Sequence, residues 1–190
     1  MMKEDDADVL AFGDGSGYKG GVGAAVVMYK EGEEVEVLRY RLGAEEDYEV
    51  YKAECVGLIL GLHAAKQMEG VKRLSIWIDN TAAITATDTA TAGPSHCLLD
   101  YFHGILRELR AIHPGIKVII SWVPGHMGYA GNKQVDIEAK KAAETAAQSS
   151  PNKKLPSQLH KRVLKSRSSA VRKYKKELET RHAQEWMESP

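Results

Sequence analysis

The stretch that sets the fold covers residues 9–42 and reads VLAFGDGSGYKGGVGAAVVMYKEGEEVEVLRYRL. It opens with a short apolar run, Val9 to Gly13, and continues with two β-rich runs, Val22 to Tyr29 and Glu34 to Leu42. The segment Lys30-Glu31-Gly32-Glu33 between the last two runs is typical of a hairpin turn. We therefore predict three consecutive antiparallel strands.

Helices and strands alternate in the chain that follows. Because a strand, a crossover helix and a parallel strand form one unit, the pattern predicts an α/β fold with a mixed five-stranded sheet flanked by helices. A short helix is also expected after Asn80-Thr81, where the sequence offers capping groups. The main expected elements are a long apolar helix over 49–68, a strand over 74–78, a helix over 96–112, a strand over 117–123 and a helix over 132–147.

The composition is that of a soluble globular protein. The 190 residues are 43% hydrophobic and 27% charged, enough for one domain with an appendage. The longest uncharged apolar run, Cys55 to Leu62, is too short to cross a bilayer, and the acidic N-terminus lacks the features of a signal peptide. Two cysteines without zinc spacing provide neither a disulfide framework nor a metal site. We expect no membrane association, no secretion and an intracellular protein of the nucleus or cytoplasm.

Charge divides the chain into two parts. Residues 1–150 hold 15 lysines and arginines against 22 aspartates and glutamates, a net charge of −7, whereas residues 151–190 hold 11 against 4, a net charge of +7. We predict a domain over 1–148, a polar, proline-containing linker over 149–157 and a basic helical tail over 158–190. The apolar residues of the tail fall roughly on one helical face: Leu159, Val163, Val171, Tyr174, Leu178 and Trp186.

Two interpretations of the tail stay open. In the first, its basic side chains contact nucleic-acid phosphates. In the second, the helix docks on the domain through Val163, Tyr174 and Trp186, and its charges offset an acidic surface. The basic residues concerned are Lys161, Arg162, Lys165, Arg172, Lys173 and Lys176.

A glycine motif, Gly15-Ser16-Gly17-Tyr18-Lys19-Gly20, formally matches the dinucleotide-binding pattern. The residues that follow it form a strand rather than the helix whose N-terminus would hold a pyrophosphate. We therefore exclude dinucleotide binding and expect a hairpin that other backbone approaches closely.

Four carboxylates occupy positions that either a role in a functional site or an ordinary structural role could explain. Asp14 ends the first strand, although Asp-Gly alone favours a hairpin turn. Glu54 lies in an apolar helix, where the first turns also suit an acid. Asp79 ends the fourth strand, where helix capping would account for it equally well. Asp136 precedes Lys140 by four residues, so that an ordinary ion pair on a helix is the simpler interpretation in isolation.

As a set, the four acids point to one site. If the first and fourth strands are neighbours, their ends and the two helices bring these carboxylates to one edge of the sheet. A group of acids without bases suits hard divalent cations such as Mg²⁺ or Mn²⁺. Two such ions, about 4 Å apart, would activate a water and stabilise the leaving oxygen in phosphodiester cleavage.

The motifs that carry these acids resemble, in order and spacing, those of the ribonuclease H family. They are Asp14-Gly15-Ser16, Tyr51-Lys52-Ala53-Glu54, Ile78-Asp79-Asn80 and Trp122-Val123-Pro124-Gly125-His126, continuing through Gly131-Asn132 to Asp136. The resemblance covers about residues 8–147 and looks closest to the ribonuclease H domains of eukaryotic, notably fungal, non-LTR retrotransposons.

The resemblance implies a ribonuclease H-like fold with strand order 3-2-1-4-5. It implies that the four acids hold two Mg²⁺ ions, with Mn²⁺ as an alternative, and that His126 assists proton transfer or product release. The expected reaction is endonucleolytic hydrolysis of the RNA strand of an RNA–DNA hybrid, by a monomer that shares a polyprotein with a reverse transcriptase domain. The residues expected to bind substrate are Gly15, Ser16, Asn80 and Asn132.

The sequence departs from the family pattern at three places. Lys133 follows Asn132 where the family commonly has Glu. Val50 and Tyr51 replace the Asn or Gln that reads RNA 2′-hydroxyls in cellular members, and the stretch from Thr85 to Ser95 has no basic residue.

Two other functions remain alternatives. One is a catalytically idle structural or nucleic-acid-binding module of a retroelement polyprotein, against which the complete set of acids and His126 argues. The other is a different nuclease or a recombinase on the same fold, against which the Pro-Gly-His loop and the three-strand meander argue.

Overall fold

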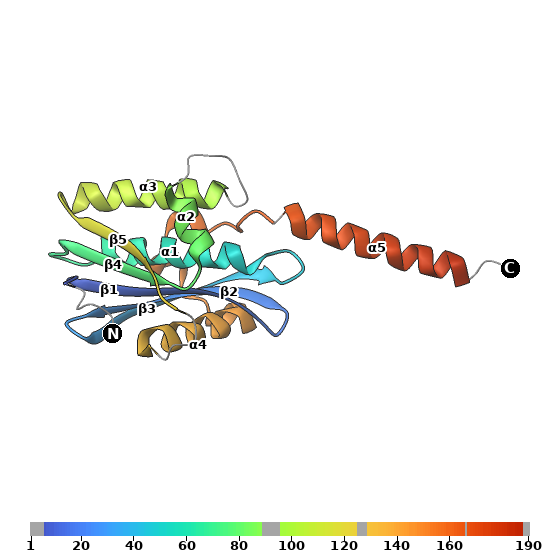
Figure 1. The fold of residues 1–190 in the computed structure, drawn as a ribbon, viewed down its shortest axis with the longest axis horizontal. Coiled ribbons are helices and arrows are strands. Elements are labelled where there is room, and N and C mark those ends of the chain that lie inside the picture. The colour runs from blue at the N-terminus through green and yellow to red at the C-terminus, as the bar shows by residue number, and fades with distance from the viewer. Residues whose placement is uncertain (1–5, 89–95, 125–128, 166, 188–190) are drawn as a thin grey trace.

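A computed structural model describes residues 6–88, 96–124, 129–165 and 167–187. Its strands form one sheet in the order β3-β2-β1-β4-β5, which confirms the predicted mixed sheet (Figure 1). The pairs β1–β2 and β2–β3 are antiparallel, and β1–β4 and β4–β5 are parallel. The elements are β1 (Val9–Tyr18), β2 (Gly21–Lys30), β3 (Glu33–Ala44), α1 (Val50–Lys66), β4 (Arg73–Ile78), α2 (Thr81–Asp88), α3 (His96–Ile112), β5 (Lys117–Trp122), α4 (Ala130–Glu144), three 3-10 turns at Ala146–Gln148, Asn152–Lys154 and Ser157–Leu159, and α5 (Arg167–Met187).

The first strand is longer than its apolar run predicts. β1 continues to Tyr18, and Asp14 pairs with Ala25 inside the β1–β2 ladder. The turn lies farther on, at Lys19 and Gly20, whose φ angles of 49° and 75° belong to the left-handed region. The hairpin-turn interpretation of Asp14-Gly15 is therefore wrong, because the ladder with β2 outweighs the local turn preference.

Helices cover both faces of the sheet. Figure 1 shows α1 between the sheet and α3, with α4 on the opposite face. The larger core lies on the α1 side and includes almost the whole of α1, which is buried from Lys52 to Ala65. The smaller core lies under α4 and consists of Phe12, Ala25, Val27, Val135 and Ala139.

Glycines allow the helices to approach the sheet at backbone distance. A Cβ atom on Gly15 would lie 2.5 Å from the Glu54 nitrogen, and one on Gly23 would lie 2.3 Å from the Ala143 nitrogen. A side chain at either position would separate α1 or α4 from the sheet. The glycine motif thus serves close packing, as its sequence context predicts.

The segment from residue 149 to residue 165, which we call the strap, lies against the domain. The hydroxyls of Ser150 and Ser149 accept hydrogen bonds from the backbone N–H groups of Arg39 (3.0 Å) and Arg41 (2.9 Å) on β3. Three strap residues join the larger core: Leu155, Leu159 and Val163. Because these side chains are buried, we propose that the folded domain extends to about residue 165 and includes the segment 149–157 that the sequence predicts as a linker.

The basic helix begins only at Arg167, after the strap. It projects away from the domain (Figure 1). Of the three residues considered for docking the tail, only Val163 is buried, whereas Tyr174 and Trp186 are 60% and 84% exposed. Among the described residues, no helix combines the length and the apolar character that a membrane crossing requires.

Candidate metal centre

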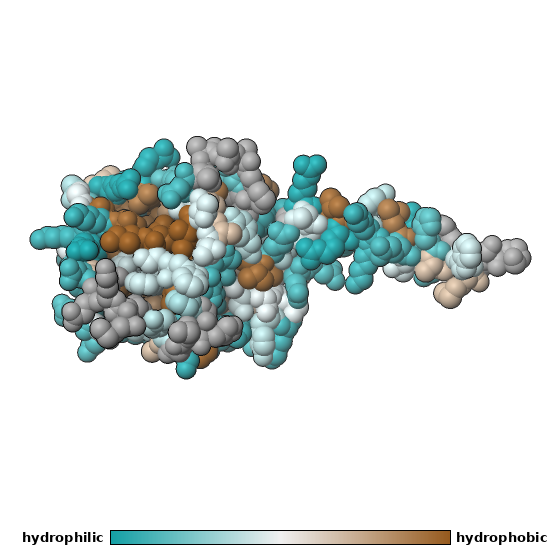
Figure 2. Space-filling view, in the orientation of Figure 1, coloured by the Kyte–Doolittle hydropathy of each residue, from teal (hydrophilic) through white to brown (hydrophobic). Residues whose placement is uncertain are grey.

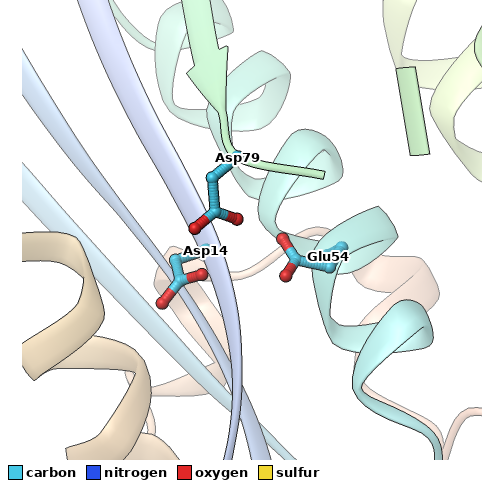
Figure 3. A group of neighbouring side chains, drawn as sticks. All are labelled: Asp14, Glu54 and Asp79. Carbon is cyan, nitrogen blue, oxygen red and sulfur yellow. The ribbon is translucent and has the colours of Figure 1, made fainter. Parts of the chain in front are cut away.

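Three carboxylates from three elements meet at one point of the fold. Phe12 pairs with Trp77 in the parallel β1–β4 ladder. Two residues farther along the chain, Asp14 lies within β1 and Asp79 directly follows β4, so that the two lie level with each other. Glu54 reaches toward both from α1 (Figure 3). One ligand oxygen from each carboxylate lies within 4.8 Å of the others. The structure thus brings together three of the four predicted acids.

Glu54 is held in the cluster by the packing of α1 on β1. Its side chain is only 4% exposed, because Gly15 lets the helix backbone contact the strand. Its Oε2 atom is buried and has no hydrogen-bond partner among the described residues. A buried carboxylate oxygen without a partner is costly, so this atom fits a position that a cation completes.

Burial and mutual repulsion shift the two buried acids strongly. Burial, followed by the charges of Asp79 and Asp136, raises the pKa of Asp14 to about 7. Burial, followed by the charges of Asp14 and Asp79, raises the pKa of Glu54 to about 9. A backbone hydrogen bond from Gly15 opposes both shifts. Without a counter-cation, these groups therefore hold protons near neutral pH.

The neighbour of Asp79 supplies the helix cap. The Asn80 Oδ1 atom accepts a hydrogen bond of 3.0 Å from the Ala83 backbone N–H at the start of α2. The Trp122 indole Nε1–H donates to the Asp79 backbone carbonyl over 3.2 Å. Because Asn80 caps α2, capping does not account for the Asp79 carboxylate, which faces the cluster instead (Figure 3).

Asp136 stands beside the cluster and is ion-paired. Its Oδ2 atom accepts a hydrogen bond of 2.7 Å from Lys140 Nζ, four residues along α4. The charges of Asp136 and Lys140 both reach Asp14, where the first raises and the second lowers its pKa. The ion-pair interpretation and the site interpretation of Asp136 are thus compatible.

The other predicted site residues are less closely tied to the cluster. Ser16 is buried on β1 two residues beyond Asp14, and Asn132 is half-buried in the first turn of α4. His126 and Gly125 lie outside the described residues. From the sequence alone, Lys140 is expected only as the ion-pair partner of Asp136. The i,i+4 spacing that revealed this pair could also have suggested a cation near Asp14.

The donor set fits a hard divalent cation. All three clustered groups are carboxylates, and oxygen ligands of this kind are those that Mg²⁺ and Mn²⁺ prefer. A bound cation would both partner the Glu54 Oε2 atom and offset the burial and the repulsion that together raise the two pKa values.

The fold and the cluster define a class of α/β proteins in which acids from two neighbouring parallel strands and a helix meet in a group that could hold a cation. The chain belongs to the RNase H family, whose model matches residues 6–144. No curated protein matches the sequence.

Solved RNase H structures share the fold at low sequence identity. The N-terminal RNase H domain of Rv2228c from Mycobacterium tuberculosis superposes with a TM-score of 0.53 at 20% identity, covering 75% of this chain and 98% of that one. RNase H1 from Halobacterium salinarum gives 0.51 at 20% identity, covering 70% and 96%. LC11-RNase H1, from a compost metagenome, was solved in complex with an RNA/DNA hybrid and gives 0.53 at 15% identity, covering 70% and 98%.

Proposed function

We propose that this protein is a Mg²⁺-dependent ribonuclease H that cleaves the RNA strand of RNA–DNA hybrids endonucleolytically. The observation that carries the proposal is the meeting of Asp14, Glu54 and Asp79 within a domain of the RNase H family. The hybrid bound to LC11-RNase H1 supports the substrate class. The expected products carry a 3′-hydroxyl and a 5′-phosphate.

The residues at the site would have different roles, which depend on where each one lies. Asp14, Glu54 and Asp79 would hold one Mg²⁺ or Mn²⁺ ion, and Asp136 would extend the site from Asp14 toward α4 for a second. The bound ions would supply charge neutralisation at the scissile phosphate and Lewis-acid activation. Asn80 and Gly15 keep two of the acids in place, the first by fixing the start of α2 and the second by letting α1 contact β1. His126 would assist proton transfer or product release.

A cleavage assay with end-labelled RNA tests the proposal. We expect the protein to cut the RNA strand of a hybrid with Mg²⁺ or Mn²⁺, to be inactive in EDTA, and to leave double-stranded DNA intact. Asp100→Asn on α3, outside the cluster, is a control that should retain activity. Hybrid binding without cleavage under any metal would identify the idle module instead. Cleavage of DNA duplexes would identify another nuclease.

The wider context belongs to the same proposal. The motif resemblance supports an origin in a non-LTR retroelement, with a reverse transcriptase domain in the same polyprotein, and a monomer acting in the nucleus or cytoplasm. A reverse transcriptase that co-purifies with the natural protein, or is continuous with it in one transcript, would support this context. A transcript that encodes the domain within an unrelated cellular protein would contradict it.

A further inference from the structure

The start of α5 is fixed at the N-terminal end of α1. The Tyr48 hydroxyl donates a 2.8 Å hydrogen bond to the Val163 carbonyl, and Lys52 Nζ donates a 2.6 Å hydrogen bond to the Leu164 carbonyl. Lys52 lies on α1 two residues before Glu54. The strap therefore places the start of α5 at the N-terminal end of α1, the helix that contributes Glu54 to the cluster.

Beyond its first turns, α5 leaves the domain. Ser168 Oγ donates a hydrogen bond to Glu49, Arg172 lies 3.6 Å from the same carboxylate, and Lys165 pairs with Asp47 at 2.8 Å just before the helix. The remaining turns extend into solvent (Figures 1 and 2). The 21 residues span about 30 Å at 1.5 Å per residue.

One face of α5 borders an open groove of about 960 Å³ and carries four basic side chains there, Arg172, Lys173, Lys176 and Arg181, beside the single acid Glu177. Lys173 and Lys176, one turn apart, line this groove opposite Glu45 and Glu46. Neither lysine has an ion-pair partner among the described carboxylates, and both are exposed. Lysines at i and i+3 repel each other on a helix, so that a shared anion is favourable there.

The opposite face of α5 is apolar. Val171, Tyr174 and Leu178 follow the i, i+3, i+7 spacing of one helical stripe, away from the groove-lining residues. This stripe would suit a protein partner. The charge balance of the whole chain favours a different occupant, because the part after residue 150 carries +7 while the body that must approach the substrate carries −7.

We propose that α5 and the end of the strap form a phosphate-binding arm that holds the nucleic acid beyond the acidic cluster. This inference rests on the proposed function for the identity of the nucleic acid. The arm reaches about 30 Å, which corresponds to about nine base pairs at 3.4 Å per pair. Hybrids too short to reach α5 should not depend on it. The proposed contacts are Lys161, Arg162, Lys173 and Lys176.

The test measures binding of fluorescein-labelled RNA–DNA hybrids of 8 and 24 base pairs to the full chain in EDTA, by fluorescence anisotropy over a salt series. The variant is K173E/K176E, and K173Q/K176Q removes the same charges without reversal. The control, R107E/R110E, makes the same charge change on exposed arginines of α3. Circular dichroism verifies that each variant keeps its helix content.

We expect K173E/K176E to weaken binding of the longer hybrid by about tenfold or more. The slope of log Kd against log salt should flatten by about 2, because each phosphate contact contributes about 1. K173Q/K176Q should flatten the slope similarly, and R107E/R110E should leave it unchanged. Equal slopes for the wild type and both lysine variants would overturn the arm. An effect of K173E/K176E that R107E/R110E reproduces would also overturn it.

The arm and the proposed function fail in different ways. Cleavage of the shorter hybrid depends on the cluster and not on α5, so that loss of hybrid cleavage contradicts the function alone. If the wild type cleaves and K173E/K176E shows the same KM on the longer hybrid, the arm is contradicted while the function stands. If no variant cleaves but the binding slope still depends on Lys173 and Lys176, the arm stands without the function.

Discussion

The pKa of Asp14 is affected by three charged neighbours, Asp79, Asp136 and Lys140. Burial raises its pKa most, Asp79 and Asp136 raise it further, Lys140 lowers it, and its own charge acts on Glu54. In cation-free buffer, Asp14→Asn should therefore leave the melting temperature unchanged or slightly higher, since it removes repulsion, while cleavage is abolished. Millimolar Mg²⁺ should raise the melting temperature of the wild type more than that of the variant. Calorimetry and the hybrid assay measure both effects, and a destabilised but active variant would contradict the site.

Glu54 links stability to pH in the absence of cations. Burial, followed by the charges of Asp14 and Asp79, raises its pKa in the folded protein to about 9, well above the ordinary glutamate value of 4.5. A carboxyl whose pKa is raised by folding stabilises the protein fully below its unfolded pKa, and this stability is lost as pH rises through the folded pKa. In EDTA, the wild-type melting temperature should thus fall by several degrees between pH 7 and pH 9, at about 1.4 kcal/mol per pH unit while only the native state holds the proton.

The matched variant for this pH effect is Glu54→Gln, which cannot titrate. Its melting temperature should stay nearly flat over the same range. A parallel decline in the variant and the wild type would show that another group is responsible. Addition of Mg²⁺ should reduce the decline in the wild type, because cation binding favours the ionised carboxylate.

At the scale of single elements, the contact between α1 and β1 determines whether the cluster forms. Gly15→Ala would place its Cβ 2.7 Å from the Ala53 carbonyl carbon and 2.5 Å from the Glu54 nitrogen. Backbone atoms on both sides leave little room to adjust, so we expect a loss of about 1–3 kcal/mol together with reduced activity. Gly104→Ala on α3 meets nothing within 4 Å and should stabilise the protein by about 1 kcal/mol. Urea unfolding of both variants tests this contrast.

Local sequence signals predicted some elements well and others poorly, for identifiable reasons. The hairpin at Lys30 to Glu33 was predictable because Gly32 favours the left-handed φ that a tight turn needs, and the structure shows such angles at Glu31 and Gly32. The end of β1 was not, because the ladder with β2 holds Asp14 to Gly17 in extended conformation. The packing of the strap was not predictable either. Polar residues and prolines surround Leu155 in the sequence, and only the tertiary structure reveals that this side chain is 5% exposed.

The candidate site was predictable as a set and not residue by residue. Each acid had an adequate local explanation, and for Asp136 that explanation holds, since its pair with Lys140 exists. The sequence could place Asp14 and Asp79 at neighbouring strand ends once the strand order was known. It could not reveal that Asn80 rather than Asp79 caps α2, because both residue types are good caps and only the hydrogen bond distinguishes them.

For the molecule as a whole, the structure predicts where the chain can be shortened. A truncation after residue 165 removes α5, most of whose large apolar side chains are exposed, and should change the melting temperature by no more than about 2 °C. A truncation after residue 148 also removes Leu155, Leu159 and Val163 from the core and should unfold the domain or lower its melting temperature sharply. In the full chain, Leu159→Ala should cost about 2–4 kcal/mol. Similar stability of the two truncations would restore residue 148 as the boundary.

The glycine contacts have a consequence for mutational screens. Gly15 and Gly23 lie against helix backbone on opposite faces of the sheet, so that any side chain at either position separates a layer. In a saturation library selected for nuclease activity, both should tolerate as few replacements as Asp14, although neither offers a group for acid–base or ligand chemistry. A parallel selection for abundance would separate the two classes: replacements of glycine would deplete the protein from cells, whereas replacement of Asp14 by asparagine would leave it plentiful and inactive.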